Sequence, residues 1–340
     1  MKLTREEMLR TFQETTWRKG IDQCLKNFEE NLPYVERTVR DLRWEVAAPS
    51  SALVVGMGPS LHRRGTAERL RRTPYDGVLV SSDGAFSYLI RRGVVPQYVI
   101  SVDYLDWVVR WFGDPELEKR GPDGYFKNLD IDPQFIKDDA ERQNQELIRL
   151  VNEVGPRVKA ILPTTIPPAI ARRCREAGMA VYWWNPILDE QDRPESLTRT
   201  LYRRVKAPCM ASGGNCGAAG YVFAATVLGA KRVGLAGIDM GYYPDTPLEK
   251  TQFYLEMKAR TPELTPEEYK ELIIRVTNPH DRTTYYTDPP YYCYREVLLN
   301  LIDQAGVETH NCAGGGTVFS DRIRWTSLED FLQGGSKWIS

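Results

Sequence analysis

The chain has 340 residues, of which 42% are hydrophobic and 27% are charged, and its formal net charge is −1. These values are typical of a soluble globular protein with a substantial core, and they exclude a uniformly basic surface for nucleic acid. No apolar run approaches the ~20 residues that cross a bilayer, and the first residues lack the apolar core of a signal peptide. We therefore expect a cytoplasmic protein without a membrane span.

The first part of the chain, residues 4 to 45, predicts two helices. Apolar residues recur at helical spacing, and Asn31-Leu32-Pro33 interrupts the pattern. Because this segment precedes the first predicted strand, we expect residues 1–48 to form an N-terminal helical appendage. Its apolar face is a packing surface, and a homo-oligomer is one use for it.

From residue 49 onward, short apolar strands alternate with helices, which is typical of a mostly parallel sheet covered on both faces. The expected fold class is α/β, a Rossmann-like doubly wound sheet in a domain of residues 49–340. Polar segments near 104–156 and 241–295 interrupt the rhythm just after strands that end in aspartate, and long insertions at that edge usually shape a site or a lid. Strands are predicted at 52–55, 77–81, 98–102, 158–162, 180–184, 233–237 and 307–311, and helices at 65–72, 86–92, 167–177 and 216–228.

A bare loop follows the first strand, with Gly56, Gly58, Pro59 and Ser60 in the sequence GMGPSL. Glycines allow a ligand to approach the backbone closely, and Pro59 suits the start of a helix whose N–H groups attract an anion. The loop departs from GxGxxG because Leu61 holds the last position, and no Walker A Gly-Lys-Ser/Thr follows. The loop therefore predicts a phosphate site without favouring NAD, and a tight turn without a ligand is the simpler alternative.

The next two strand ends carry carboxylates. Asp83, followed by Gly84, lies 25 residues beyond Gly58, close to the spacing at which an acid meets a ribose hydroxyl in doubly wound folds. Asp83 is equally suited to cap a helix that starts at Ala85. Asp103 ends the third strand, where a carboxylate acts as a general base, holds Mg²⁺ or is simply solvated.

A second glycine-rich loop, Ser212-Gly213-Gly214-Asn215, leads into a helix of small residues. Successive N–H groups in such a loop form a nest for a phosphate or carboxylate, and the Asn215 amide suits a base or a sugar. We therefore expect Ser212, Gly213, Gly214 and Asn215 to bind nucleotide together with the first loop.

Two later strand ends supply further candidates for a catalytic base. Asp239 lies in the sequence GIDMGY, and His310 is a weaker candidate near the last predicted strand end, where Gly314-Gly315-Gly316 follow. The insertion between them carries cations and phenols, which suit a phosphorylated or acidic substrate. We expect no zinc site, because the six cysteines and three histidines are scattered and no CxxC occurs.

The ordered set of motifs resembles the 6-hydroxymethylpterin diphosphokinase MptE-like family, a superfamily that also includes the motility accessory factor (Maf) glycosyltransferases. The resemblance covers residues 50 to 333 and consists of GxGPSL, DGA, SVD, GGNCGAAG, GIDMGY and THNCAGGG. It implies a Rossmann-like nucleotide-binding transferase. MptE-type enzymes transfer diphosphate from ATP to a pterin and use Mg²⁺, whereas Maf-type enzymes transfer a nonulosonic acid from a CMP-activated donor to a protein hydroxyl.

Three functions follow from these observations. The first is glycosyl transfer from a CMP-activated nonulosonic acid to an acceptor protein or small molecule, for which we assign no cofactor. The long lid after GIDMGY and the lack of an HGDN-like segment favour this function. The second is an Mg²⁺–ATP-dependent 6-hydroxymethylpterin diphosphokinase, in which Asp103 and Asp239 are metal ligands. The third is nucleotide binding without catalysis.

Overall fold

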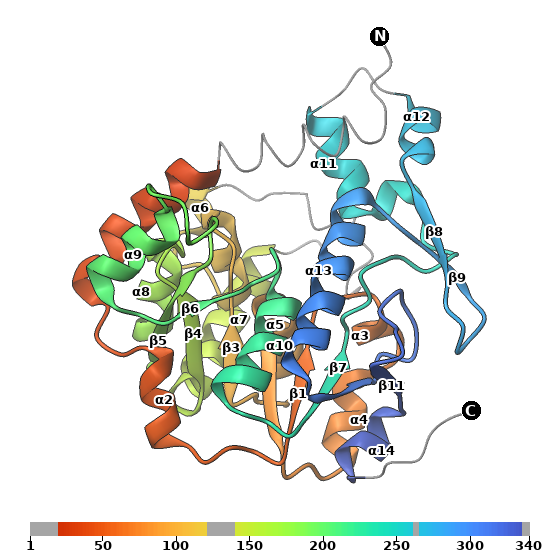
Figure 1. The fold of residues 1–340 in the computed structure, drawn as a ribbon, viewed down its shortest axis with the longest axis horizontal. Helices are drawn as coiled ribbons and strands as arrows, with labels where there is room; N and C mark the ends of the chain where they lie inside the picture. The colour runs from red at the N-terminus through yellow and green to blue at the C-terminus, as the bar shows by residue number, and fades with distance from the viewer. Residues whose placement is uncertain (1–19, 121–139, 261–264, 335–340) are drawn as a thin grey trace.

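The computed structural model describes residues 20–120, 140–260 and 265–334. Within these residues nine parallel strands form one sheet in the order β11-β10-β7-β1-β2-β3-β4-β5-β6, and β8 and β9 form a separate antiparallel hairpin. The predicted α/β doubly wound fold is confirmed (Figure 1). The strands are β1 (Ser51–Val55), β2 (Val78–Ser82), β3 (Tyr98–Ile100), β4 (Lys159–Pro163), β5 (Ala180–Pro186), β6 (Cys209–Met210), β7 (Arg232–Ala236), β8 (Ile274–Thr277), β9 (Thr284–Thr287), β10 (Glu308–Asn311) and β11 (Ile323–Trp325).

Helices connect these strands and cover both faces of the sheet. Those between β1 and β5 are α3 (Ser60–Arg63), α4 (Thr66–Arg72), α5 (Asp83–Arg91), η2 (Asp106–Phe112), α6 (Leu117–Arg120), α7 (Ala140–Val154), η5 (Gly155–Arg157) and α8 (Pro168–Glu176). Before β1 come a helix over residues 20–31, η1 (Leu32–Tyr34) and α2 (Val39–Glu45). After β5 come α9 (Leu197–Val205), α10 (Cys216–Val222), the π-helical turn η6 (Phe223–Val227), η7 (Leu248–Lys250), α11 (Gln252–Arg260), α12 (Pro266–Glu271), α13 (Pro289–Ala305) and α14 (Leu328–Leu332).

Alternate residues of each strand point to opposite faces, and this alternation divides the core. Val54 packs in the same cluster as residues of α2, α10 and α13, whereas Leu53 packs with residues of α4, α5 and α14. A third cluster joins Val99 of β3 to α5, α7, α8 and η2. The molecule is therefore a three-layer αβα sandwich with β1 near its centre.

The segment from 104 to 156 is not a lid in the parts that the structure describes. Val108, Phe112, Leu147 and Val151 are buried in the cluster with β3 and β4. Acidic, basic and amide side chains of α7 face outward from this cluster, and η2 and α7 lie in the crossing from β3 to β4. The GPDGYFKN sequence lies outside the described residues.

The N-terminal helices are joined to the sheet layer by specific contacts. Val39 and Leu42 of α2 belong to the main core cluster. The carboxamide of Asn27, in the helix over residues 20–31, donates to the carbonyl oxygens of Tyr104 (3.1 Å) and Thr165 (3.0 Å). These contacts place that helix over the loops that follow β3 and β4.

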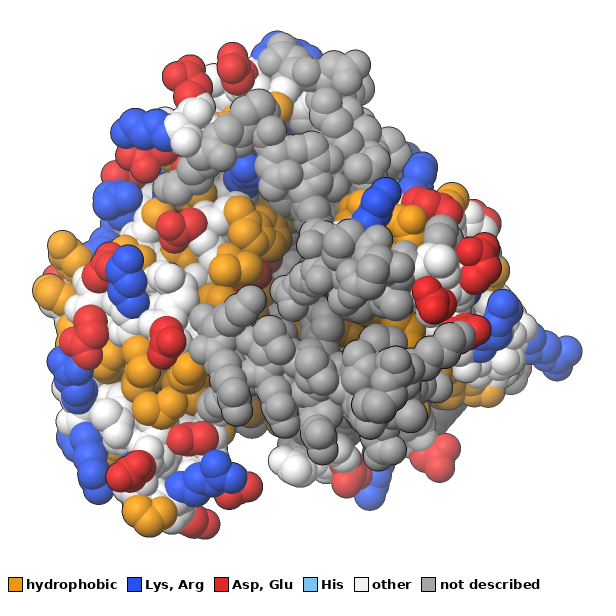
Figure 2. All heavy atoms as spheres, turned by 90° about the horizontal axis from the view of Figure 1, so that it is seen from above, with side chains coloured by type: hydrophobic (Ala, Val, Ile, Leu, Met, Phe, Trp, Pro, Cys, Tyr) orange, Lys and Arg blue, Asp and Glu red, His pale blue; other side chains and the backbone are white. Residues whose placement is uncertain are grey.

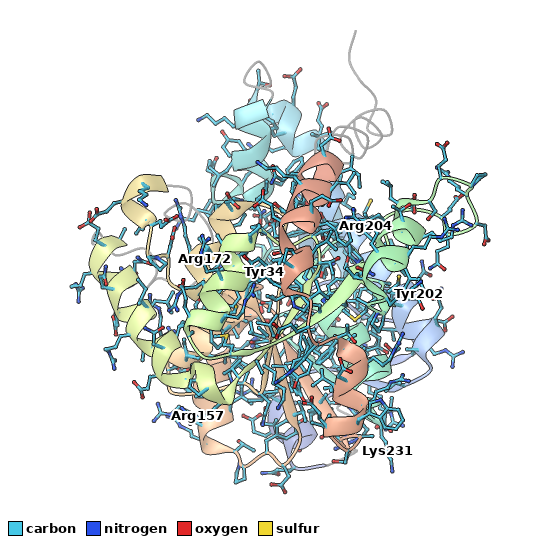
Figure 3. All side chains as sticks on the ribbon, turned by 90° about the vertical axis from the view of Figure 1, so that its left-hand side faces the viewer. Tyr34, Arg157, Arg172, Tyr202, Arg204 and Lys231 are labelled. Atoms are coloured by element: carbon cyan, nitrogen blue, oxygen red, sulfur yellow. The ribbon has the colours of Figure 1, made fainter. Side chains whose placement is uncertain are left out.

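The outer surface beside β5 carries α8 and α9 (Figure 3). Arg204 of α9 forms an ion pair with Glu29, which fastens the helix over residues 20–31 to α9. Tyr34 and Tyr202 remain 50% and 37% exposed on this side of the molecule. On the face seen in Figure 2, acidic and basic side chains are interspersed over the described surface, and that described part shows no continuous basic patch. No helix in the described ranges has the length and apolar character needed to traverse a bilayer.

Candidate functional site

The order of the strands fixes where a ligand crevice opens. From β1 the chain continues outward through β2 to β6, and it then returns to the other side of β1 with β7, β10 and β11. The switch point therefore lies between β1 and β7, and ligands of doubly wound folds bind outside the carboxyl ends of the strands at such a point. The loops that follow β1 and β7 contain Gly56 to Ser60 and Gly237 to Met240.

Glycines at this switch point allow the two loops to touch. The N–H of Gly56 donates to the carbonyl of Ala236 (2.8 Å), and the N–H of Gly58 donates to that of Gly237 (2.7 Å). A Cβ on Gly56 would lie 2.6 Å from the Gly237 carbonyl oxygen, and Gly237 itself has φ +63°. The close contact between the two loops thus explains why some positions that suggested a phosphate site are glycines.

Ser60 binds a carboxylate of the protein itself. Its N–H and its hydroxyl donate to Oδ2 of Asp239, at 3.0 Å and 2.9 Å. A Cβ on Gly58 would lie 2.2 Å from the same oxygen, so only glycine leaves room for Asp239. Pro59 precedes α3 as its N-cap, and α3 has only four residues, too few for a substantial helix dipole.

Asp239 is 1% exposed, and its other carboxylate oxygen, Oδ1, has no hydrogen-bond partner among the described residues. Burial raises the pKa of Asp239 to about 6, against the lowering effects of the two Ser60 bonds and of the nearby His62 and Arg64. A carboxyl group with a pKa near neutrality and an unused oxygen is suited to accept a proton.

Asp83 lies on the other side of β1 in a closed set of contacts. Its carboxylate accepts from the Gly84 N–H (2.7 Å) and from the Ser101 hydroxyl (2.6 Å), and the thiol of Cys216 lies 3.6 Å from Oδ2. Burial raises its pKa, and the bonds from Ser101, Gly84 and Cys216 oppose that rise. The expectation that Asp83 caps a helix starting at Ala85 is wrong, because α5 begins at Asp83 and the Ser82 hydroxyl accepts from the Ala85 N–H.

The second glycine-rich loop reaches the same region. Asn215 is the N-cap of α10: its side-chain oxygen accepts from the Ala218 N–H (2.9 Å), and its amide nitrogen donates to the Gly213 carbonyl (3.1 Å). Gly213 and Gly214 have φ of +57° and +76°, and the Gly214 N–H lies 3.4 Å from the Ser212 hydroxyl.

These loops converge around the end of β1. The side chain of Met57 packs against Gly84, and Gly217, just after Cys216, packs against Ile238. The structure therefore brings together both glycine-rich loops, Asp83 and Asp239. Ser101 and Cys216 complete the Asp83 side. The sequence interpretation counted Cys216 only among six scattered cysteines, although its place directly after the loop was the available signal.

Asp103 is half-buried beside this group, and its carboxylate accepts from the Leu105 N–H at 3.1 Å. Burial and the carboxylate of Asp83 raise the pKa of the Cys216 thiol well above its usual value, and the charge of Asp103 adds to the rise. Asp103 thus belongs to the Asp83 side of the crevice. Strands β1 and β2 separate the ends of β3 and β7, which puts the starts of the loops bearing Asp103 and Asp239 about 14 Å apart at the usual strand spacing.

His310 is not brought to the crevice. It is 0% exposed and lies inside β10 opposite Gly234, whereas Asp239 follows the end of β7. Its ring nitrogens are 2.8 Å from the Thr326 hydroxyl and 2.8 Å from a Glu308 carboxylate oxygen. Burial lowers its pKa against the effect of Glu308, so this histidine is a bonded core residue in the structure.

A third group of residues surrounds Asp239 and was not proposed as a site from the sequence. Tyr243 follows GIDMGY directly, Arg63 and Arg64 follow the first loop, and Gly315 and Gly316 come from the segment after β10. The Arg63 guanidinium lies 4.5 Å from the centre of the Tyr243 ring. A Cβ on Gly316 would lie 2.8 Å from the Asp239 carbonyl oxygen.

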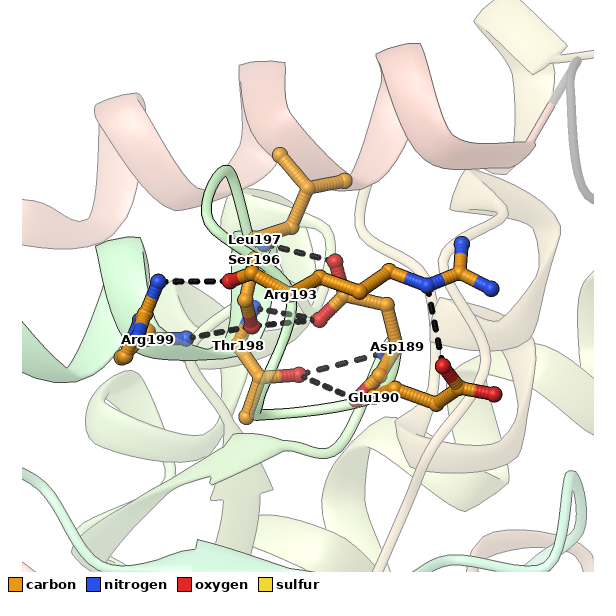
Figure 4. Close-up of polar contacts among 7 residues, drawn as sticks. All are labelled: Asp189, Glu190, Arg193, Ser196, Leu197, Thr198 and Arg199. Carbon is orange, nitrogen blue, oxygen red and sulfur yellow. Dashed lines mark hydrogen bonds and ion pairs between the residues drawn. The ribbon is translucent and has the colours of Figure 1, made fainter.

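A different network, distant in the chain from these loops, fixes the start of α9 (Figure 4). The carboxylate of Asp189 accepts from the Ser196 hydroxyl (2.7 Å) and from the N–H groups of Leu197 (2.7 Å) and Thr198 (3.1 Å). These hydrogen bonds of the Asp189 carboxylate all come from residues at the start of α9, so we interpret Asp189 as a structural cap of that helix.

Comparison with known proteins supports the fold. No family model matched the sequence, and no curated protein matched it either. Among solved structures, the chain is similar to a Maf glycosyltransferase from Magnetospirillum magneticum AMB-1, with a TM-score of 0.52 and 16% sequence identity. The match covers 87% of this chain and 35% of the other, so this chain spans about a third of the length of that protein. At this identity the likeness shows a shared α/β fold.

Proposed function

We propose that this chain is a nucleotide-binding transferase that moves a glycosyl group, specifically a nonulosonic acid from a CMP-activated donor, in the crevice at the end of β1. The motif resemblance to the superfamily of Maf and MptE supports the reaction class. The fold shared with a Maf glycosyltransferase is consistent with it and does not specify the substrate.

The buried carboxylate of Asp239 is the observation that carries the proposal. Ser60 holds one oxygen, and the other has no partner among the described residues. In the proposed reaction, an acceptor hydroxyl oxygen forms a bond to the anomeric carbon as the bond from that carbon to the CMP phosphate oxygen breaks. CMP leaves with the bonding electrons, and Asp239 accepts the proton of the acceptor hydroxyl.

The nucleotide fits better toward the Asp83 side than into the donors of the first loop. The N–H groups of Gly56, Gly58 and Ser60 already donate to protein oxygens, so they can bind a phosphate only if the loop rearranges. Asp83 and Asn215 are bonded within the protein as well, but a carboxylate oxygen accepts a second hydrogen bond and the Asn215 amide has a second N–H, so both keep capacity for a ribose or a base. We retain Asp83, Gly84 and the loop from Ser212 to Asn215 as the proposed nucleoside contacts.

The arrangement of acids does not fit the diphosphokinase alternative. That reaction needs Mg²⁺ held around a triphosphate, and Asp103 and Asp239 follow strands with two others between them. Asp239 also uses one oxygen for Ser60. Among the described residues, no group of three or more histidines, cysteines and acids is placed to hold a metal ion. We therefore derive no step through Mg²⁺.

A thermal-shift panel of CMP, CDP, ATP, GTP and UDP, each with Mg²⁺ or with excess EDTA, tests the proposal. A ligand at 100 times its Kd stabilises by ~2.7 kcal/mol, which gives a readable rise in Tm. We expect CMP to stabilise more than ATP and EDTA to leave the CMP shift unchanged. Stabilisation by ATP alone, and only with Mg²⁺, would reverse the ranking, and no shift with any nucleotide would remove the proposal.

Two isosteric variants then separate catalysis from binding without catalysis. Asp239→Asn keeps an acceptor for Ser60 but cannot take a proton, so it should bind CMP and lose transfer from a CMP-sugar. Asp103→Asn is the matched variant on the other side of β1. Loss of transfer in Asp103→Asn alone would assign the base to Asp103.

A further inference from the structure

Two oxygen atoms near the switch point have no hydrogen-bond partner among the described residues, although both are buried. They are Oδ1 of Asp239 and the hydroxyl oxygen of Tyr243. Burial raises the pKa of Tyr243 to about 12 and the Asp239 carboxylate adds to the rise, whereas the nearby Arg64 opposes it. A buried polar atom left without a partner lowers stability, so two of them together indicate a site kept for a ligand.

The same short segment packs against both residues. A Cβ on Gly315 would lie 2.9 Å from the Tyr243 hydroxyl, and a Cβ on Gly316 would lie 3.2 Å from the Cβ of Asp239. Gly314 and Gly316 have φ of +67° and +86°, conformations that glycine adopts readily. The segment Gly314–Gly316 is thus a thin backbone cover without side chains against the Tyr243 hydroxyl and the backbone of Asp239.

Few side chains hold this cover in place. Arg64 donates to the Gly314 carbonyl at 2.6 Å in an exposed contact, and the buried amide of Asn278 donates to the Gly316 carbonyl at 2.9 Å. The Arg64 end is the more accessible of the two. An anionic ligand group at this edge would bond the guanidinium in place of the Gly314 carbonyl, because hydrogen bonds between charged partners are the stronger ones.

The charges around the two oxygens define the ligand chemistry. Asp239 offers an acceptor, the phenol of Tyr243 both donates and accepts, and Arg64 supplies a cation at the rim. A ligand that satisfies all three has a hydroxyl group for the buried pair and an anionic group a few ångströms away.

We propose that Asp239 and Tyr243 form a subsite, covered by Gly314–Gly316, for a hydroxyl group of an anionic polyhydroxylated ligand whose charge binds Arg64. The inference rests on the proposed function, and it assigns this subsite to the sugar acid rather than to the nucleotide. A carboxylate oxygen has two lone pairs, so Oδ1 of Asp239 accepts from this hydroxyl with one and receives the proton of the acceptor with the other. Ser60 is the positioning residue that orients Asp239 toward the subsite. Tyr243 is thus a further proposed ligand-binding residue beside Asp239.

The first test needs no ligand. Tyr243→Phe removes a hydroxyl with no partner and keeps the ring under Arg63, so we expect an unchanged or raised Tm. The matched variant is Tyr242→Phe, because the neighbouring hydroxyl donates to Asp288 at 2.8 Å in a buried contact. That variant should lower the Tm. A Tm lowered equally in both variants would show that the Tyr243 hydroxyl has a structural partner, and would overturn the proposal.

The second test uses N-acetylneuraminate, free and CMP-activated, and CMP alone, by calorimetry with the full chain. Tyr243→Phe should weaken binding of both sugar-acid probes about tenfold, the effect of one hydrogen bond, and should leave CMP binding within twofold. Unchanged affinity for the sugar acids, or no binding of either to the wild-type chain, would overturn the subsite. Failure of CMP to bind would instead contradict the proposed function, so the two failures are distinguishable.

Discussion

At the scale of single residues, the glycines of the first loop have a physical role that needs no ligand. Gly58 is a glycine because Oδ2 of Asp239 occupies the space of a side chain, and Gly56 because the loop after β7 passes against it. The buried surroundings of Asp239 disfavour the ionised form of its carboxyl group. Burial of an acid with an unpaired oxygen reduces stability, and such trade-offs are typical of functional positions.

The titration of Asp239 gives the first prediction at this scale. Its pKa is raised from 3.8 to about 6 in the folded protein, so the folded state binds the proton more tightly than the unfolded state. Stability therefore falls as the pH rises from about 4 to about 6, and a shift of two units corresponds to at most about 3 kcal/mol. Asp239→Asn should be more stable than the wild type at pH 7.5, and the difference should disappear near pH 4.

Urea denaturation of both proteins across this pH range measures the effect. A variant that is less stable than the wild type at pH 7.5 would contradict the prediction, since it would show that the ionised carboxylate is stabilised by a partner. The amide variant is the suitable one, because its oxygen still accepts from Ser60.

At the scale of elements, the strands of the central sheet followed from their apolar runs, and the elements at its margins did not. Strand β6 has two residues and β11 has three, too few to show periodicity. In the hairpin, β8 alternates half-buried and exposed residues and β9 buries Tyr285 and Thr287. The segment is rich in threonine and tyrosine, and its sequence indicated only an insertion. The helix predicted over 216–228 includes α10 and then changes to the π-helical turn η6 at Phe223.

The capping of α9 gives a prediction at this scale. Burial alone would raise the pKa of Asp189, but hydrogen bonds from the Leu197 N–H, the Ser196 hydroxyl and the Thr198 N–H outweigh it and hold the pKa at about 2. Asp189 therefore stabilises the fold above pH 4, and this contribution is lost as the pH falls through about 2. Asp189→Asn should lower the free energy of unfolding at pH 7 by about 1 kcal/mol.

Glu190→Gln is the matched control for this prediction. Its carboxylate pairs with Arg193 at 3.0 Å on an exposed surface (Figure 4), and such pairs contribute little. Denaturation at pH 7 and at pH 3 compares the two variants. Equal losses, or a loss in Asp189→Asn that does not diminish in acid, would show that the cap is not the cause.

At the scale of the whole molecule, one sheet carries the main core, and a second, small cluster lies apart from it. Phe253 and Tyr254 of α11, Tyr269 of α12 and Leu272, which follows α12, pack together near the β8–β9 hairpin, at the upper right of Figure 1. Tyr242 connects this region to α13 and to the site, because its ring contacts Tyr286 of the hairpin and stacks on Tyr291 of α13. The region is thus a separate packing unit joined next to Asp239.

Local unfolding of this unit is the prediction at the largest scale. Phe253→Ala should remove much of the small cluster, since such truncations cost ~3–5 kcal/mol, and should speed hydrogen exchange in α11 and α12. Amides of β1 and β7 should keep wild-type protection. Phe331→Ala, in the cluster that covers β1 and β7, is the control that should lower protection throughout the sheet. Faster exchange in β1 after Phe253→Ala would show that the two units unfold together.

Simple repeating patterns in the sequence were enough to predict the buried strands such as β1 and β4, the helices between them, and therefore the α/β class. The sequence also placed Gly58, Asp83 and Asp239 at strand ends, because chain order and parallel pairing are enough for that. Which strand ends meet depends on the order of the strands in the folded sheet. Chain order does not reveal that β7 returns beside β1, and this pairing puts Asp239 on Ser60 and leaves His310 inside β10. Contacts of this kind join residues about 180 positions apart, and no local spacing in a sequence encodes them.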